Sequence, residues 1–191
     1  MYNVIDDVLL SEFQETDLVQ HISKEIARYV EEQTILYSKE NGGYKTNTID
    51  YQKEDTVFHY LWTAIFNNQE IKEILDLEEY EGSLHANFME SGTSNGPHCH
   101  EQISDKVLLF YPYPVVYDEK DGGQLVIYEG EPNTTTKEGI YFICSEEGLY
   151  NPQPISYKFD RAIVMDSDVY HSVNPYYGEG RISVVWDLVK K

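Results

Sequence analysis

The hydrophobic pattern changes near residue 80, which limits the chain to folds that combine helices with a separate β-sheet body. Before that point, apolar residues recur every three or four positions over Asp17–Ser38, which predicts an amphipathic helix. The same spacing over residues 55–67 and 69–77 predicts two more helices. A loop is expected over Lys39–Thr48, where two glycines interrupt the pattern.

After residue 80, short runs rich in β-branched and aromatic residues alternate with glycine, proline and asparagine turns. The runs are Leu84–Met89, Val107–Tyr113, Gln124–Tyr128, Gly139–Cys144, Ala162–Met165 and Arg181–Leu188. Short strands at this spacing predict a β-sandwich or jelly roll. No linker divides the chain, so we expect one α+β domain over residues 1–191. Residues 1–79 would form a mainly helical support, and residues 80–191 the β core.

Charge and composition narrow the expected partners. Lys and Arg number 14 against 34 Asp and Glu, a net charge of −20 that repels phosphate backbones and anionic lipid. We therefore expect neither a nucleic acid nor a membrane surface as partner. No stretch approaches the roughly 20 apolar residues of a membrane span. The sequence also begins without a secretory signal and contains only two cysteines, so we expect a cytoplasmic protein.

Three histidines in the β half are candidate metal ligands. His98 and His100 are two residues apart, so on an extended strand both imidazoles lie on one face, whereas Cys99 points away. His171 lies far downstream, and a close pair with one distant ligand is what a barrel brings around one metal ion. The alternative is that His98 and His100 are merely polar residues at the start of a strand.

Two further pairs of residues share a strand face. Arg181 and Ser183 can bind a carboxylate together, since a guanidinium group offers parallel donors and a hydroxyl adds another. The alternative for Arg181 is an ion pair with a surface carboxylate. His85 and Asn87 are candidates for the wall of a substrate pocket; otherwise they are buried polar groups with hydrogen bonds in the core.

Five motifs occur in a fixed order between about residues 80 and 190. They are His98, Leu108-Leu109-Phe110-Tyr111, Gly122-Gly123-Gln124-Leu125, Lys158–Met165 leading to His171, and Arg181-Ile182-Ser183. This series resembles the Fe(II)- and 2-oxoglutarate-dependent dioxygenases, in particular their prolyl-4-hydroxylase-like branch. The resemblance implies a double-stranded β-helix, which is a cupin-like jelly-roll barrel, with N-terminal supporting helices.

The resemblance also implies an activity and its cofactors. His98, His100 and His171 would hold Fe(II) as the catalytic centre, and Tyr111 with Arg181 and Ser183 would bind 2-oxoglutarate. With O2, such an enzyme converts 2-oxoglutarate to succinate and CO2 and hydroxylates an unactivated carbon, with ascorbate as a candidate reductant. The substrate would be a small molecule such as an amino acid, a peptide or a protein.

Two positions depart from the family pattern. His100 stands where the family has an aspartate ligand. We favour direct ligation by His100; Glu101 or Asp105 on a bent loop is an alternative, as is a vacant position, which admits a halide in halogenating relatives. Phe88 stands where relatives often have a cosubstrate-binding tyrosine, so Tyr111 is expected to provide more of that contact.

Two other functions compete with a hydroxylase. One is a cupin-like metalloprotein with a three-histidine site that does not use 2-oxoglutarate. The other is a non-catalytic binding module that keeps the barrel but has lost the aspartate ligand. Halogenation and desaturation also remain as alternative outcomes of the same chemistry. Replacing Arg181 separates the hydroxylase from the cupin-like protein, because only the hydroxylase needs that side chain to bind a cosubstrate.

Overall fold

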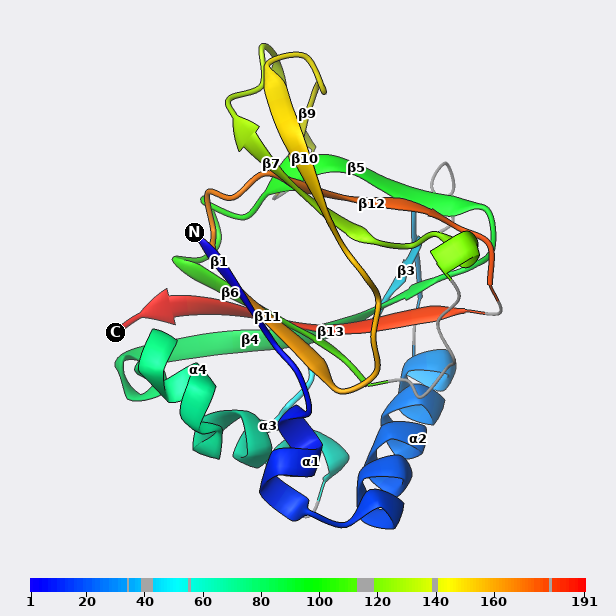
Figure 1. Ribbon diagram of the computed structural model, residues 1–191, viewed down its shortest axis with the longest axis vertical. Coiled ribbons are helices and arrows are strands. Elements are labelled where there is room, and N and C mark those ends of the chain that lie inside the picture. Colours follow the sequence, from blue (N-terminus) through cyan, green and yellow to red (C-terminus); the bar gives the residue numbers. More distant parts are fainter. Residues whose placement is uncertain (34, 39–42, 55, 113–118, 139–140, 179) are drawn as a thin grey trace.

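The computed structural model describes the chain except residues 34, 39–42, 55, 113–118, 139–140 and 179. Its strands form two antiparallel sheets that face each other, and the helices pack against the outside of one sheet (Figure 1). Among the described residues, one sheet has the order β1-β11-β6-β13-β4-β3-β2 and the other the order β10-β7-β12-β5-β9-β8. The predicted jelly roll with N-terminal supporting helices is confirmed.

The described α-helices lie within residues 1–79, the part of the chain predicted to be mainly helical. They are α1 (Val8–Phe13), α2 (Thr16–Gln33), α3 (Val57–Asn67) and α4 (Gln69–Ile74), followed by the 3-10 helix η1 (Leu77–Glu79). The prediction of one helix over Asp17–Ser38 is wrong at its end, because α2 stops at Gln33 and Ile35–Ser38 is strand β2. The apolar run Ile35-Leu36-Tyr37 suits a strand as well as a helix, so periodicity does not separate the two. None of the described helices has the length and apolar character needed to cross a membrane.

The strands are more numerous than the sequence indicated. They are β1 (Tyr2–Ile5), β2 (Ile35–Ser38), β3 (Gly43–Lys45), β4 (Tyr80–Met89), β5 (Thr93–Cys99), β6 (Lys106–Tyr111), β7 (Leu125–Gly130), β8 (Thr135–Glu138), β9 (Tyr141–Cys144), β10 (Leu149–Ile155), β11 (Arg161–Asp166), β12 (His171–Tyr176) and β13 (Arg181–Lys190), with the 3-10 helix η2 (Glu119–Asp121) before β7.

The six predicted strands correspond to β4, β6, β7, β9, β11 and β13. Tyr113 and residues 139–140, at the ends of two of these predictions, lie outside the described residues, as do residues 39–42 and 55. The loop expected over Lys39–Thr48 is wrong at Gly43–Lys45, which is β3 and pairs with β4. Gly43 thus begins a short strand that lies between β4 and β2 in the seven-stranded sheet.

The hydrophobic core has two layers, one on each face of the seven-stranded sheet. Side chains alternate along β13, so successive residues belong to different layers. Even-numbered residues from Ile182 to Leu188 pack with the helices, on the outside of the seven-stranded sheet. Odd-numbered positions face the other sheet, where Val185 belongs to the second apolar cluster. The four odd-numbered residues from Arg181 to Asp187 are all buried, and three of them are polar or charged. The space between the sheets is therefore where polar chemistry is concentrated.

A buried aspartate from the far end of the chain caps α1. Asp160 adopts a left-handed backbone (φ 60°), and its carboxylate accepts hydrogen bonds from the backbone N–H groups of Leu9 (2.7 Å) and Leu10 (3.0 Å). Helix α1 has no side-chain cap of its own at Asp7. These two N–H groups belong to the helix turn that has no intrahelical acceptors, so Asp160 supplies what the local sequence does not.

We expect Asp160→Ala to lower the free energy of unfolding by roughly 2–3 kcal/mol, from the lost cap and the left-handed backbone. Asp160→Asn should cost less, because asparagine tolerates that backbone and keeps one acceptor oxygen. Urea denaturation at pH 7.5 measures both, since burial raises the pKa of Asp160 only to about 6. The exposed Asp168→Ala is the control and should change little. Equal losses for the alanine and asparagine variants would contradict this role.

Candidate functional site

His98, His100 and His171 form a compact cluster between the two sheets. His98 near the end of β5 lies opposite His171 at the start of β12, and His100 follows β5 directly. The ring centroids are 4.2 Å apart for His98 and His171, 5.3 Å for His100 and His171, and 5.5 Å for His98 and His100. One nitrogen of each ring lies within 4.8 Å of the others, the one such potential metal-binding group among the described residues.

In all three rings, Nδ1 is next to an oxygen that can only accept a hydrogen bond. The acceptors are the Gly96 carbonyl for His98 (2.8 Å), the Val169 carbonyl for His171 (2.9 Å) and Asp187 Oδ1 for His100 (2.7 Å). Each Nδ1 therefore donates a proton, so the neutral form of each ring has an unprotonated Nε2. This is the tautomer in which an imidazole binds a metal ion through Nε2.

Burial keeps two of these imidazoles neutral. Burial, with the nearby His100, lowers the pKa of His98 to about 4, and it lowers the pKa of His171 well below its usual 6.5. Both rings are therefore unprotonated at neutral pH, the state that a metal ligand requires. Three converging imidazole nitrogens suit a divalent first-row ion such as Fe(II), so the residues present fit such a metal.

The alternative third ligands lie elsewhere. Glu101 is exposed, and Asp105 Oδ2 accepts a hydrogen bond from the backbone N–H of Lys190 (2.7 Å). Neither belongs to the cluster of possible ligand atoms, which among the described residues contains the histidines alone. Cys99 is buried outside this cluster as well, and burial raises the pKa of its thiol. The structure thus brings His100, and neither carboxylate, beside His98 and His171.

Arg181 provides a buried positive charge at the start of β13. Its side chain donates to the Tyr111 hydroxyl (2.9 Å) and to the Gly123 carbonyl (2.9 Å), and its guanidinium lies 5.0 Å from the centre of the Tyr111 ring. Within the part of the chain that the structure describes, no carboxylate forms an ion pair with it. Because buried charges are normally paired, the guanidinium is suited to receive an anionic ligand.

The predicted Gly-Gly turn places an acceptor for Arg181. Gly122 and Gly123 both have positive φ angles, 70° and 72°. A Cβ on Gly122 would lie 1.9 Å from the Pro175 carbonyl oxygen, so the turn cannot accept a side chain there. This close approach positions the Gly123 carbonyl, which accepts the Nε–H of Arg181. Ser183, buried two residues along β13, shares the face of Arg181.

Comparison with known proteins supports the fold. No protein-family model and no curated protein matched the sequence. Among solved structures, a prolyl-4-hydroxylase from Pseudomonas putida is 18% identical, with a TM-score of 0.67 over 100% of this chain and 92% of that chain. The epimerase SnoN, in complex with Fe3+, alpha ketoglutarate and nogalamycin RO, is 13% identical, with a TM-score of 0.73 over 99% and 78%.

A third similar structure is a prolyl hydroxylase from Trichoplax adhaerens in complex with a hypoxia inducible factor peptide fragment. It is 14% identical, with a TM-score of 0.65 over 99% of this chain and 83% of that chain. The chain has the fold of the Fe(II)- and 2-oxoglutarate-dependent oxygenases. At these identities the likeness concerns the fold, and the residues of this chain decide what its site can do.

In this oxygenase fold, Tyr157 rather than Phe88 lies beside Arg181. The Phe88 side chain packs against the helix layer and so does not face the space between the sheets. Tyr157, fully buried between β10 and β11, lies 4.8 Å from the Tyr111 ring and 5.4 Å from the Arg181 guanidinium. The sequence contains no local signal for Tyr157, because it lies outside every strand and matches none of the family motifs quoted.

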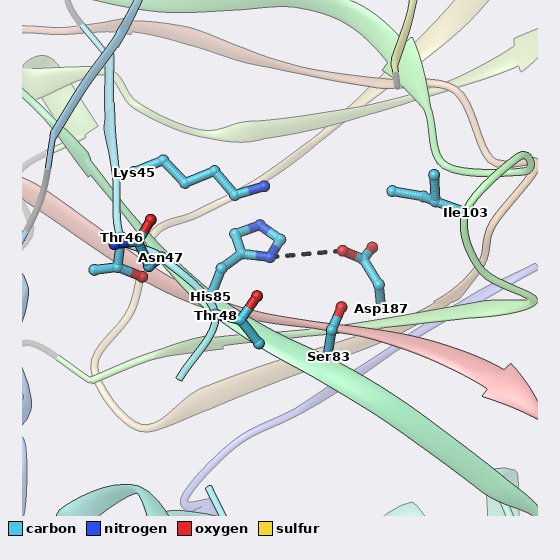
Figure 2. Close-up of a pocket in the computed structure, with 8 residues that line it drawn as sticks. All are labelled: Lys45, Thr46, Asn47, Thr48, Ser83, His85, Ile103 and Asp187. Atoms are coloured by element: carbon cyan, nitrogen blue, oxygen red, sulfur yellow. Dashed lines mark ion pairs between the residues drawn. The ribbon is translucent and has the colours of Figure 1, made fainter. Parts of the chain in front are cut away.

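A cavity of about 330 Å³ lies beside the histidine cluster, with Asp187, the partner of His100, in its wall. Seven of its eight lining residues are polar or charged; the full set is Lys45, Thr46, Asn47, Thr48, Ser83, His85, Ile103 and Asp187. Figure 2 shows Lys45, His85 and Asp187 directed toward one another, with His85 Nδ1 3.5 Å from Asp187 Oδ2. The sequence indicated His85 but missed Lys45 and Asp187, and Asn87 does not line this cavity.

Electrostatics at this cavity favour a neutral histidine between two charges. Burial, followed by the charge of Lys45, lowers the pKa of His85 to about 3. Burial alone would raise the pKa of Asp187, but the hydrogen bond from His100 and the nearby basic groups hold it below its usual value. The cavity therefore offers one cation and one anion, both close to the histidine cluster.

Proposed function

We propose that the protein is an Fe(II)- and 2-oxoglutarate-dependent dioxygenase that hydroxylates an unactivated carbon of an amino-acid, peptide or protein substrate. The observation that supports it best is the buried Arg181 guanidinium, which has no described carboxylate partner and shares the space between the sheets with three converging histidines. A cupin-like metal site has no need of such a cation, whereas a dicarboxylate cosubstrate does.

Each role belongs to a named group. His98, His100 and His171 would hold Fe(II) through Nε2, and their Nδ1–H bonds would fix the ring orientations. Arg181 and Ser183 would bind the far carboxylate of 2-oxoglutarate, with the Tyr111 hydroxyl, which accepts from Arg181, donating its own proton to that carboxylate.

Bound iron with 2-oxoglutarate supplies the oxidising chemistry: 2-oxoglutarate and O2 give succinate and CO2 while a substrate C–H becomes C–OH, with ascorbate as a reductant. The apolar side chains around the site, among them Leu125, Ile127 and Val185, are buried and would exclude water from this chemistry. We assign the whole of residues 1–191 to one catalytic domain, since strands from both ends of the chain build the sheet that contains Arg181.

The polar cavity beside His100 is our candidate substrate site, with His85 in its wall. Its volume of about 330 Å³ is at the lower end of ligand pockets, which suits an amino acid or one side chain of a peptide. The complex of the Trichoplax adhaerens enzyme with a peptide fragment supports a peptide as one option. The net charge of −20 favours a basic or zwitterionic substrate over an acidic polymer.

Anaerobic titration with Fe(II), in the presence and absence of 2-oxoglutarate, tests the proposal. We expect a visible charge-transfer band only when both are present, and succinate release once O2 is admitted. Iron binding without the band would instead support the cupin-like metalloprotein. Failure to bind iron would support the non-catalytic binding module.

A further inference from the structure

The histidine cluster contains no carboxylate, but the carboxylate of Asp187 is hydrogen-bonded to one of its three rings. Its Oδ1 lies 2.7 Å from His100 Nδ1, although the two residues are 87 positions apart in the sequence. Both side chains are about 93% buried, so water does not weaken the interaction. This is the one imidazole of the three whose Nδ1 contacts a charged acceptor, since His98 and His171 contact carbonyl groups.

Direct ligation by Asp187 does not fit the geometry. Among the described residues, its carboxylate lies outside the group of possible ligand atoms formed by the histidines, and Oδ1 already accepts a hydrogen bond from His100 Nδ1. Its second oxygen, Oδ2, points toward His85 at 3.5 Å and the cavity wall. Asp187 is therefore joined to the cluster through its hydrogen bond to His100.

We propose that Asp187 is a positioning residue that holds and polarises His100 as a metal ligand, so that a carboxylate hydrogen-bonded to a ligand replaces the aspartate ligand that the site lacks. This inference rests on the proposed metal site. A hydrogen-bonded carboxylate fixes the imidazole tautomer and makes Nε2 a stronger donor. It also places a negative charge near three neutral ligands, which would otherwise leave the full charge of a divalent ion uncompensated in a buried site.

The contact between His100 and Asp187 is held by the backbone on both sides. Asp187 lies on β13, which pairs with β4 on one side and with β6 on the other. Two neighbours in these strands, Ser83 and Val107, lie directly opposite it. The backbone N–H of His100 also donates to the Ser167 carbonyl (2.7 Å), so both partners are anchored on separate elements.

Metal affinity of Asp187 variants tests this inference. Co(II) is the probe, because its visible absorption reports the number and kind of its ligands. In Asp187→Asn, the amide oxygen can still accept from His100 Nδ1–H, but the charge is lost. We expect its Co(II) affinity to fall about 10- to 100-fold, the usual cost of losing an outer-shell partner. The spectrum at saturation should stay unchanged, since the ligands are the same.

Two more variants complete the test. Asp187→Glu restores the charge and should recover part of the affinity lost in Asp187→Asn, which a purely structural role would not predict. Asp160→Asn is the matched control: it changes a buried carboxylate outside the site and should bind Co(II) as the wild type does. Thermal denaturation of the metal-free proteins checks that each variant is folded.

The outcomes separate this inference from the proposed function. Wild-type protein that binds neither Co(II) nor Fe(II) would overturn the metal site itself. Wild-type binding with an unchanged affinity in Asp187→Asn would overturn only the role of Asp187. A changed Co(II) spectrum in Asp187→Asn would also overturn it, because Asp187 would then be a ligand. If Asp187→Asn proves unstable, the comparison of Asp187→Glu with the wild type still decides whether the carboxylate position controls affinity.

Discussion

Arg181→Gln is expected to abolish the 2-oxoglutarate-dependent absorption band while Fe(II) binding is retained. Glutamine can still donate to the Gly123 carbonyl, which limits the structural damage, but it has no charge and no paired donors for a carboxylate. Truncating one partner of a buried charge pair costs about 2–5 kcal/mol, so 2-oxoglutarate affinity should fall at least about 30-fold. Anaerobic titration of Fe(II)-loaded protein with 2-oxoglutarate measures the loss.

Arg161→Gln is the matched control for Arg181. Arg161 lies on β11 and forms a bidentate ion pair with Asp6, with distances of 2.7 and 3.0 Å, so its donors are already occupied. Its replacement should affect stability and leave 2-oxoglutarate affinity unchanged. An intact band in Arg181→Gln would exclude the proposed cosubstrate site, and with it the main distinction from a cupin-like metalloprotein.

His171→Ala and His100→Ala are each expected to remove most of the metal affinity. Both rings are buried in the cluster, and losing a direct ligand should cost more than the roughly 10- to 100-fold typical of an outer-shell partner. Anaerobic Fe(II) titration followed by desalting and iron analysis measures retention. Comparable losses in the two variants would indicate that His100 is a ligand equal to His171.

An exposed histidine on α2, His21, gives the control for these variants. His21→Ala removes an imidazole far from the cluster and should retain iron as the wild type does. Full iron retention in His100→Ala, together with loss in His171→Ala, would show that His100 does not ligate. That result would favour the vacant coordination position, and halide dependence of the reaction would then be the next measurement.

The sequence was most informative where one local pattern decides the geometry. His98 and Arg181 could be located because each belongs to a short motif on or beside a strand, and alternation predicts which neighbours share its face. Strands β10 and β12 escaped prediction, since prolines at positions 152, 154 and 175 mimic turns. Strand β1 escaped because its four residues form too short a run to stand out.

The parts of the site that could not be predicted are contacts between distant elements. Asp187 looked like one polar residue near the end of an apolar strand, and only the fold brings it against His100. Lys45 lay in a segment predicted as a loop, yet β3 pairs with β4 and places it at the cavity. Tyr157 lies outside the strands, so neither alternation nor a motif identifies it. Such contacts depend on the register of the sheets, which local propensity does not contain.

Strand β13 carries both Arg181, proposed to bind the cosubstrate, and Asp187, proposed to position a metal ligand. Its inward positions run from Arg181 at the proposed cosubstrate end to Asp187 at the metal and cavity end, in steps of two residues. Insertion or deletion of one residue within this strand would reverse the facing of the residues on one side of the change. Either Arg181 or Asp187 would then point toward the helices. Sequence change within β13 is therefore restricted to substitution. New substrate preferences are easier to acquire through β3 and the segment after it, which line the cavity without setting the register of the core.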